Sequence, residues 1–245
     1  MRTLILSDIH ANLPAFEAVL ADAGAYDRLI FLGDLANFGP HPAECAELLR
    51  SCRTTVCIMG NHDEQILSAS PKHPWDVWSK KQLTQEQQGW MRGFKQSYVI
   101  DGHIFAIHGI YNAPDILPNT PDADIRNAFK NLLPSGIDEV WFGHYHYQID
   151  RVIDGITYRC IRPAGHHRDK DTRASYSVYE DGAVSHKRVP YRLGQTAADL
   201  RALPTDCFET NEKKEEYLVF FQNAFHEGLL RKDLAAMKEN DKRTV

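Results

Sequence analysis

The chain has 245 residues, with 28 Lys and Arg against 33 Asp and Glu, which gives a formal net charge of −5. Since a domain usually takes 100–200 residues, this length fits one large α/β domain with an appendage and excludes a multidomain protein. An apolar fraction of 43% excludes long disordered stretches. The negative charge disfavours a surface that coats polymeric nucleic acid.

The sequence contains no apolar run near the roughly 20 residues that span a bilayer. Met1-Arg2 leads directly into a strand-like run, without the apolar core of a signal peptide. We therefore expect a soluble, cytoplasmic protein with no membrane partner. The cysteines are odd in number and form no CxxC pair, which indicates neither a disulfide framework nor a thiolate zinc site; they are Cys45, Cys52, Cys57, Cys160 and Cys207.

The first sixty residues repeat a unit of strand, loop and helix. Short apolar runs predict strands over 3–8, 28–34 and 55–60. Asn12 and Pro14 are typical of a helix cap and first turn, and a second helix is expected over 42–50. Continuous apolar runs that alternate with amphipathic helices predict a parallel sheet covered on both faces.

Residues 64–97 form a helical excursion or cap, in which Trp75, Trp78 and Trp90 are expected to pack internally rather than stack on a ligand. Thr84 and Gln87 fit a capping box. The remaining elements predict a sheet-centred sandwich: a hairpin over 98–107, a helix over 124–133, a strand over 139–143, and short antiparallel strands over 151–158, 176–179 and 184–189.

The composition shifts after Pro190, where 212–238 carries apolar residues at helical spacing, among them Leu218, Phe221 and Phe225. We expect this helix to pack on the body, and a homo-oligomer or partner surface is the alternative. The predicted organisation is therefore one domain over 1–191 and a helical appendage over 192–245 that is not an independent domain.

Short polar clusters stand where the predicted strands end. Because ligands of open α/β sheets bind beyond the carboxyl ends of strands, side chains from remote segments are expected to converge there. Asp8 and His10 are two residues apart and share one face of an extended segment, as do His144 and His146. The candidate residues are Asp8, His10, Asp34, Asn61, His62, Asp63, His108, His144 and His146.

Two carboxylates, an amide oxygen and several imidazoles, with no thiolate, suit divalent Mn, Fe, Ni or Zn rather than copper(I). Two such ions bring four positive charges, of which Asp8 and Asp34 cancel two. A bridging hydroxide and a phosphodiester would cancel the rest. The predicted chemistry is hydrolysis at phosphorus.

These residues resemble the motif set of the calcineurin-like metallophosphoesterases in order and spacing. The motifs are Asp8-x-His10, Gly33-Asp34, Gly60-Asn61-His62-Asp63, His108 and Gly143-His144-x-His146. With Arg173-Ala174-Ser175-Tyr176, the chain is similar to the compact branch called YfcE-like or MJ0936-like phosphodiesterases over roughly 1–191. The resemblance implies an α/β/β/α sandwich of two mixed sheets flanked by helices. It also implies two divalent metal ions, Mn²⁺ foremost, with Fe, Ni, Zn or Mg as alternatives.

The resemblance also implies a role for each motif residue. The first metal would be held by Asp8, His10, Asp34 and His146, and the second by Asp34, Asn61, His108 and His144. Asp34 would bridge the two ions. His62 would lie over the substrate and donate a proton or hydrogen bond toward the leaving oxygen, with Asp63 orienting it.

The loop before Arg173 departs from the family pattern, since Arg162-Pro163-Ala164-Gly165-His166-His167 replaces the usual Asn-Pro-Gly-Ser-Val-Gly. Arg162, His166, His167 and Arg168 are the candidate substrate-binding residues, whereas Arg173 is at least as well suited to a structural ion pair.

The leading hypothesis is a binuclear phosphoesterase that acts on small phosphodiesters or phosphoanhydrides, nucleotides included. A protein serine/threonine phosphatase and a metal-binding scaffold without strong catalysis are the alternatives. A nuclease acting on polymeric DNA would need a basic track, against which the net charge argues.

Overall fold

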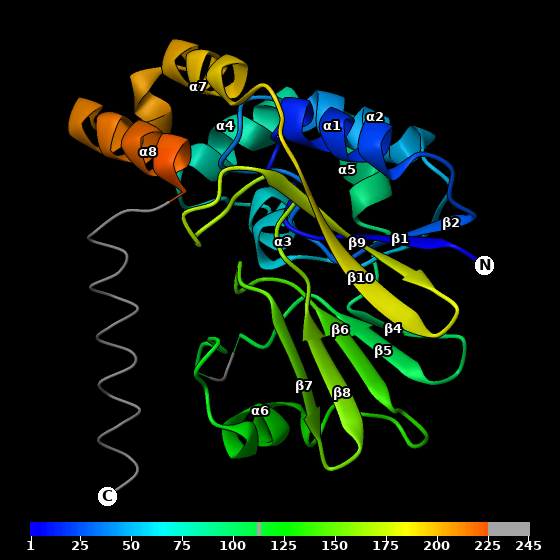
Figure 1. Ribbon diagram of the computed structural model, residues 1–245. Coiled ribbons are helices and arrows are strands. Elements are labelled where there is room, and N and C mark those ends of the chain that lie inside the picture. The colour runs from blue at the N-terminus through cyan, green and yellow to red at the C-terminus, as the bar shows by residue number, and fades with distance from the viewer. Residues whose placement is uncertain (112–113, 225–245) are drawn as a thin grey trace, which may run out of the picture.

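The computed structural model describes residues 1–111 and 114–224. Its strands form two five-stranded mixed sheets that face each other (Figure 1). The first sheet has the order β10-β9-β1-β2-β3 and comprises β1 (Thr3–Leu6), β2 (Arg28–Phe31), β3 (Thr54–Cys57), β9 (Ala174–Glu180) and β10 (Ala183–Val189). The second has the order β4-β5-β6-β8-β7 and comprises β4 (Ser97–Ile100), β5 (Ile104–Ile107), β6 (Glu139–Phe142), β7 (Ile149–Ile153) and β8 (Ile156–Cys160).

The predicted parallel arrangement holds for β1, β2 and β3, while β9 and β10 add an antiparallel edge to the same sheet. In the second sheet, the segment predicted over 151–158 turns at Asp154-Gly155, where both residues have positive φ angles. This turn separates β7 from β8, and β8 pairs parallel to β6 rather than joining only antiparallel neighbours. The expected sandwich of two mixed sheets is confirmed.

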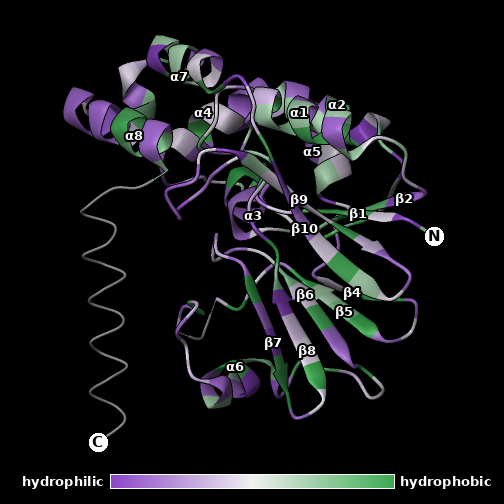
Figure 2. Ribbon diagram, in the orientation of Figure 1, coloured by the Kyte–Doolittle hydropathy of each residue, from purple (hydrophilic) through white to green (hydrophobic). Residues whose placement is uncertain are grey.

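Side chains of β1 alternate between two apolar layers because both faces of its sheet are covered. Ile5 packs in the layer between the sheets together with Ile30 and Trp141. Leu4 and Leu6 instead face the helices α1 (Leu13–Ala23) and α2 (Pro42–Ser51). Figure 2 shows apolar residues concentrated along the strands and polar residues over much of the helical surface.

A single described helix, α6 (Asp122–Phe129), packs on the outer face of the second sheet through Ile125 and Phe129. The sequence predicts this helix over 124–133. The structure starts it two residues earlier, directly after Pro121, and ends it at Phe129, where Leu132 N–H bonds to the Phe129 carbonyl in a turn.

The cap consists of α3 (Asn61–Leu67), α4 (Pro74–Gln82) and α5 (Gln85–Met91). The predicted capping box is confirmed, since Thr84 and Gln87 exchange hydrogen bonds of 3.0 and 3.1 Å. The tryptophans pack internally as predicted: Trp75 and Trp78 join one apolar cluster and Trp90 lies against another.

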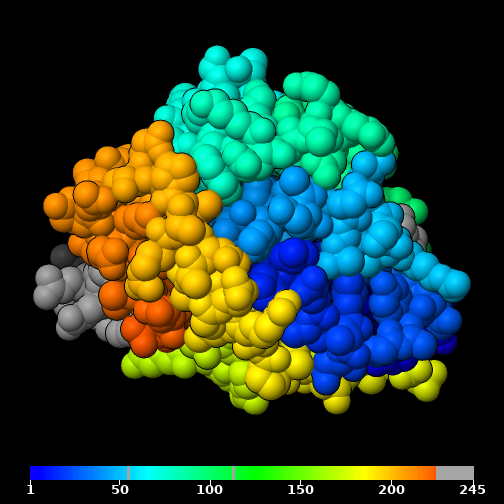
Figure 3. Space-filling model, turned by 90° about the horizontal axis from the view of Figure 1, so that it is seen from above, coloured from blue at the N-terminus to red at the C-terminus, as the bar shows by residue number. Residues whose placement is uncertain are grey.

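Beyond β10, the chain continues into α7 (Leu193–Ala202), a 3₁₀ turn η1 (Thr205–Phe208) and α8 (Asn211–Asn223). Leu218 and Phe221 of α8 are buried with Trp75 of the cap, so the described part of this helix packs on the body. Seen from above, the segment of α7 and α8 lies beside the cap (Figure 3), and α7 also contacts α1. The part of the predicted helix after Ala224, including Phe225, lies outside the described residues. No helix among the described residues is both long and apolar enough to cross a membrane.

Candidate metal centre and active site

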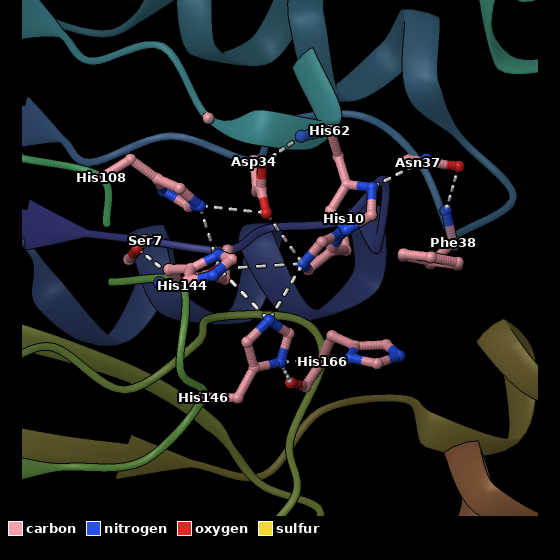
Figure 4. A network of polar contacts seen from close by, with 12 residues as sticks. Ser7, His10, Asp34, Asn37, Phe38, His62, His108, His144, His146 and His166 are labelled. Atoms are coloured by element: carbon pink, nitrogen blue, oxygen red, sulfur yellow. Dashed lines mark hydrogen bonds and ion pairs between the residues drawn. The ribbon is translucent and has the colours of Figure 1, made fainter. Parts of the chain in front are cut away.

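The residues predicted as metal ligands come from loops that follow strands of both sheets, at the edge where the sheets adjoin (Figure 4). The loops of the first sheet carry Asp8 and His10 after β1, Asp34 after β2, and Asn61 at the start of α3 after β3. The loops of the second sheet carry His108 after β5, and His144 and His146 after β6. The site therefore belongs to the seam between the sheets.

The donor atoms of these side chains crowd together at distances that suit a shared cation. His108 Nε2 lies 3.1 Å from Asp34 Oδ2, and His10 Nε2 lies 3.7 Å from the same oxygen. His146 Nε2 lies 3.3 Å from Asp8 Oδ1 and 3.3 Å from His10 Nε2. Ligands about 2.1 Å from one ion stand roughly 3.0–3.4 Å apart, so three of these four separations are those of a coordination shell and the fourth is slightly longer.

Several of these atoms are buried without a hydrogen-bond partner among the described residues. They are Asp8 Oδ1, Asp34 Oδ2, Asn61 Oδ1 and His108 Nε2. A buried polar atom left unsatisfied costs about 1–3 kcal/mol, so four in one place require a common partner. Oxygen and imidazole donors are what borderline or hard divalent ions bind, and the residues present fit such ions.

Two imidazoles are oriented by hydrogen bonds from their far side. His108 Nδ1 lies 2.5 Å from the Leu32 carbonyl, and His146 Nδ1 lies 2.5 Å from the His166 carbonyl. Because a carbonyl only accepts, each Nδ1 carries a proton and donates it, which leaves Nε2 directed at the centre. This is how metal-binding histidines are usually held.

The electrostatics of the centre keep its carboxylates ionised and favour neutral imidazoles at His10 and His144. His108 differs: burial alone would lower its pKa, but the Asp34 carboxylate beside it raises the pKa to about 9. Burial alone would raise the pKa of Asp34, but the imidazoles of His108 and His62 hold it well below its usual range. Burial, with His108 nearby, lowers the pKa of His144 to about 3. Both groups are thus in the protonation state that binds a cation.

Five of the predicted ligands have left-handed backbone conformations, which cost about 1–2 kcal/mol per non-glycine residue. The φ angles are 52° at Asp8, 49° at His10, 60° at Asp34, 70° at His144 and 63° at His146. Such strain persists where the surroundings enforce it, and it clusters at functional sites.

Close backbone approach helps to enforce these conformations. A Cβ on Gly143 would lie 1.8 Å from Ser7 Oγ and 2.6 Å from Asp8 Oδ2. A Cβ on Gly60 would lie 2.1 Å from Asp34 Oδ1. The glycine of each motif is therefore needed for space at the ligand beside it.

The hydrogen bonds of Asp63 differ from the expectation that it orients His62. Its carboxylate accepts from the backbone N–H groups of Gly60, Asp34 and Leu35 at 3.1, 2.9 and 2.9 Å. At the third position of α3, its side chain points back to the helix start, which is the geometry of a capping carboxylate. Asp63 thus ties the β2 loop to the β3 loop.

His62 is instead contacted by Asn37 of the β2 loop and, through it, by the cap. Asn37 Oδ1 accepts from the Phe38 N–H at 3.0 Å, and Asn37 Nδ2 donates to Asp76 Oδ1 at 2.7 Å. These two bonds fix the orientation of the amide, so the group 3.2 Å from His62 Nδ1 is an N–H donor. Nδ1 must accept, and the ring proton of neutral His62 therefore resides on Nε2.

A pocket of about 220 Å³ opens beside the centre. Its lining combines predicted ligands with residues of two further loops: Asp34, His62, Asp115, Leu117, His144, Tyr145, His146 and Arg168. Of the four predicted substrate-binding residues, Arg168 alone belongs to this lining.

The other three predicted substrate-binding residues do not line this pocket. Arg162 forms a side-chain hydrogen bond with Gln148 and lies 3.5 Å from Asp169 Oδ2. His166 and His167 are 6% and 5% exposed. The His166 ring stacks on Phe38 at 5.7 Å and on Tyr217 of α8 at 6.0 Å between ring centres, and its carbonyl orients His146. The ring also lies beside the metal centre, since His166 forms a third group of possible ligands with His10 and His146.

Sequence reasoning missed Asn37, Asp76 and Asp115. Asn37 had a local signal, because it follows Asp34 by three residues in the same loop. Asp76 and Asp115 had none, since only the folding of α4 and of the loop after β5 brings them to the site.

A sandwich of two mixed sheets with buried carboxylates and imidazoles at its strand ends defines a metal-dependent hydrolase. Residues 1–181 match the family described as calcineurin-like phosphoesterase. The chain belongs to that family and is accordingly a phosphoric ester hydrolase.

Three relatives illustrate the likeness. The structure of a metallophosphoesterase from Sphaerobacter thermophilus has a TM-score of 0.75 and 28% identity, covering 91% of this chain and 100% of that one. Phosphodiesterase YfcE of Escherichia coli strain K12 is 31% identical over 159 residues, which are 56% of this chain and 79% of YfcE. A symmetrical bis(5'-nucleosyl)-tetraphosphatase of Pseudomonas entomophila is 38% identical over 73 residues, 28% of this chain and 26% of that protein.

Proposed function

We propose that the chain is a binuclear metallophosphoesterase that hydrolyses small phosphodiesters or phosphoanhydrides, nucleotides among them. The observation that carries this proposal is the sharing of Asp34 between two groups of donors. Asp34 lies with Asp8 and His10 in one group and with His108 and His144 in another, with donor atoms within 4.8 Å of one another in each. A carboxylate common to two adjacent donor groups is what a pair of ions requires.

Manganese is the ion we propose first, since the oxygen and imidazole donors suit it. Bound divalent ions would supply charge neutralisation at the phosphoryl group and lower the pKa of water. Asp8 and His146 would contribute to one ion, Asn61 and His144 to the other.

The chain's own hydrogen-bond donor toward the leaving oxygen is His62. His62 lines the pocket, and its Nδ1 accepts a hydrogen bond from Asn37. The Nε2–H group is therefore free to donate to the leaving oxygen. Donation of this hydrogen bond by the neutral ring stabilises the negative charge that develops on the leaving oxygen as the ester bond breaks.

The proposal extends to the substrate and the compartment. The local match to a protein named bis(5'-nucleosyl)-tetraphosphatase supports a phosphoanhydride substrate, and the match to YfcE supports a phosphodiester. All five cysteines are free, in keeping with a reducing cytoplasm.

The test is hydrolysis of bis-p-nitrophenyl phosphate and of dinucleoside polyphosphates by protein whose metal content is measured by mass spectrometry. We expect two ions per chain and turnover with Mn²⁺. Absence of turnover with Mn²⁺, Fe²⁺, Ni²⁺, Zn²⁺ and Mg²⁺, in protein shown to hold two ions, rejects the hydrolase. A content of one ion per chain rejects the binuclear centre.

The role of His62 is tested by His62→Ala, with His103→Ala as the matched control. His103 is exposed near the β4–β5 turn and pairs with Asp138. We expect His62→Ala to retain both ions and to lower kcat by about 10²–10³-fold, the usual loss when one hydrogen-bond donor to developing negative charge is removed. Equal kcat values for the two variants would remove His62 from the mechanism.

A further inference from the structure

Arg168 is a cationic side chain in the pocket for which the described residues supply no carboxylate partner. It lines the cavity of about 220 Å³ together with Asp34, His62 and the two histidines that follow β6. Its Nε atom is buried and has no hydrogen-bond partner among the described residues. A guanidinium carries five N–H donors in a planar fork that matches carboxylate and phosphate oxygens.

The neighbouring arginines are all engaged, which sets Arg168 apart. Arg173 binds Asp171, with Nη2 2.6 Å from Oδ2. Arg188 pairs with both Asp169 and Asp171, and Arg162 approaches Asp169. Asp169 and Asp171 are thus taken by other arginines, which leaves Arg168, a residue of the pocket lining, without either carboxylate.

We infer that Arg168 binds a second phosphate of the substrate, adjacent to the one that is hydrolysed. This inference rests on the proposed function, in which two divalent ions, two carboxylates, a hydroxide and a phosphodiester already sum to zero charge. Outside the metal ligands, the described lining holds two further charged groups, Asp115 and Arg168, and of these only the guanidinium can bind an anion. Its unpaired Nε donor fits another phosphate of the substrate. The substrate class is therefore a phosphoanhydride with at least two linked phosphates.

The pocket also limits what else is recognised. At about 220 Å³ it is smaller than the 300–1,000 Å³ typical of sites that enclose a whole small molecule. It has room for the phosphate groups, whereas the organic part of the substrate would lie outside. The carboxylate of Asp115 in the same lining disfavours an anion beside it, which leaves Arg168 as the anion contact away from the metal ligands.

The test measures dissociation constants of imidodiphosphate and of orthophosphate by calorimetry on the Mn²⁺-loaded protein. Arg168→Gln is compared with wild type and with Arg173→Gln, a control on the same loop whose partner is Asp171. Since a hydrogen bond to a charged group contributes about 1.5–3 kcal/mol, we expect Arg168→Gln to weaken imidodiphosphate binding by about 10–100-fold. The loss should be at least tenfold larger than for orthophosphate. Arg173→Gln should bind both anions as wild type does.

Equal losses for the two anions would overturn the inference, because Arg168 would then contact the phosphate at the metal centre itself. An unchanged imidodiphosphate constant in a variant with wild-type thermal unfolding would also overturn it. The outcome is separable from that of the proposed function. Selective loss of imidodiphosphate binding, in protein that hydrolyses no ester, would reject the hydrolase and retain the anion site.

Discussion

Replacing Asn37 by Leu should allow neutral His62 to adopt both tautomers and should lower turnover. The amide of Asn37 presents an N–H to His62 Nδ1 at 3.2 Å, which keeps the ring proton on Nε2. A net hydrogen bond is worth about 0.5–1.5 kcal/mol, and about 1.4 kcal/mol corresponds to tenfold. We therefore expect kcat to fall by about 2–10-fold, well short of the loss expected for His62→Ala.

The same substitution should also destabilise the fold, and a second change separates the two effects. Asp76 is 2% exposed and loses its donor in Asn37→Leu, at a cost of about 1–3 kcal/mol in the free energy of unfolding. Replacing both partners with apolar groups removes this cost, so Asn37→Leu/Asp76→Leu should recover most of the stability. It should not recover kcat, because His62 still lacks its donor.

The assay combines three measurements on wild type and both variants: nitrogen NMR of labelled histidine, thermal unfolding and kcat. We expect wild-type His62 to show a single tautomer protonated at Nε2, and each variant to show a mixture. Asp76→Asn serves as the control, since an amide oxygen still accepts from Asn37. The reasoning is refuted if wild-type His62 carries its proton on Nδ1, or if the double variant recovers kcat together with stability.

Three further predictions concern the metal centre and the fold. Gly60→Ala should lose bound metal by mass spectrometry, since its Cβ would stand 2.1 Å from Asp34 Oδ1, whereas Gly89→Ala, with no atom within 4 Å, should retain it. Burial alone would raise the pKa of Asp150, but hydrogen bonds from the side chains around it hold it well below its usual range. The ionised Asp150 thus contributes to stability above the unfolded pKa of about 3.9, and this contribution is lost as the pH falls further. Asp150→Asn should therefore unfold more easily than wild type at pH 7, and the difference between the two should shrink below about pH 4. Phe221→Ala should lower the free energy of unfolding by about 3–5 kcal/mol in chemical denaturation, because Phe221 is 7% exposed in the cluster that joins α8 to the cap; a change below 1 kcal/mol would contradict that packing.

The sequence predicts the ligand set well because each ligand follows an apolar strand, and the topology of parallel strands brings those ends together. Asp8 and Asp34 could be placed at one edge without knowing a single contact. The residues that orient His62 could not be predicted, since their positions depend on how the cap folds. Asp63 and Asn37 illustrate this: proximity in sequence favours Asp63 as the partner of His62, but the start of α3 directs its carboxylate to backbone amides.

The loop around His166 shows a second limit. Its residue types suggest substrate contacts, yet burial against Phe38 and Tyr217 depends on α8, more than forty residues further along the chain. Charge alone did not distinguish Arg168 from Arg162 either. The positions of Asp169 and Asp171 decide which arginine is paired and which is left without either carboxylate.

The seam between the sheets has a consequence for how the protein matures. Neither sheet carries all of the predicted ligands. Loops of the first sheet supply the carboxylates, the amide and His10, and loops of the second supply the other three imidazoles. An isolated half of the molecule would therefore offer each ion only part of its ligands, as the first sheet does with Asp8, His10 and Asp34. Each ion would have its full set of ligands only once both sheets have packed together. Its binding would then stabilise the fully folded protein relative to partly folded forms.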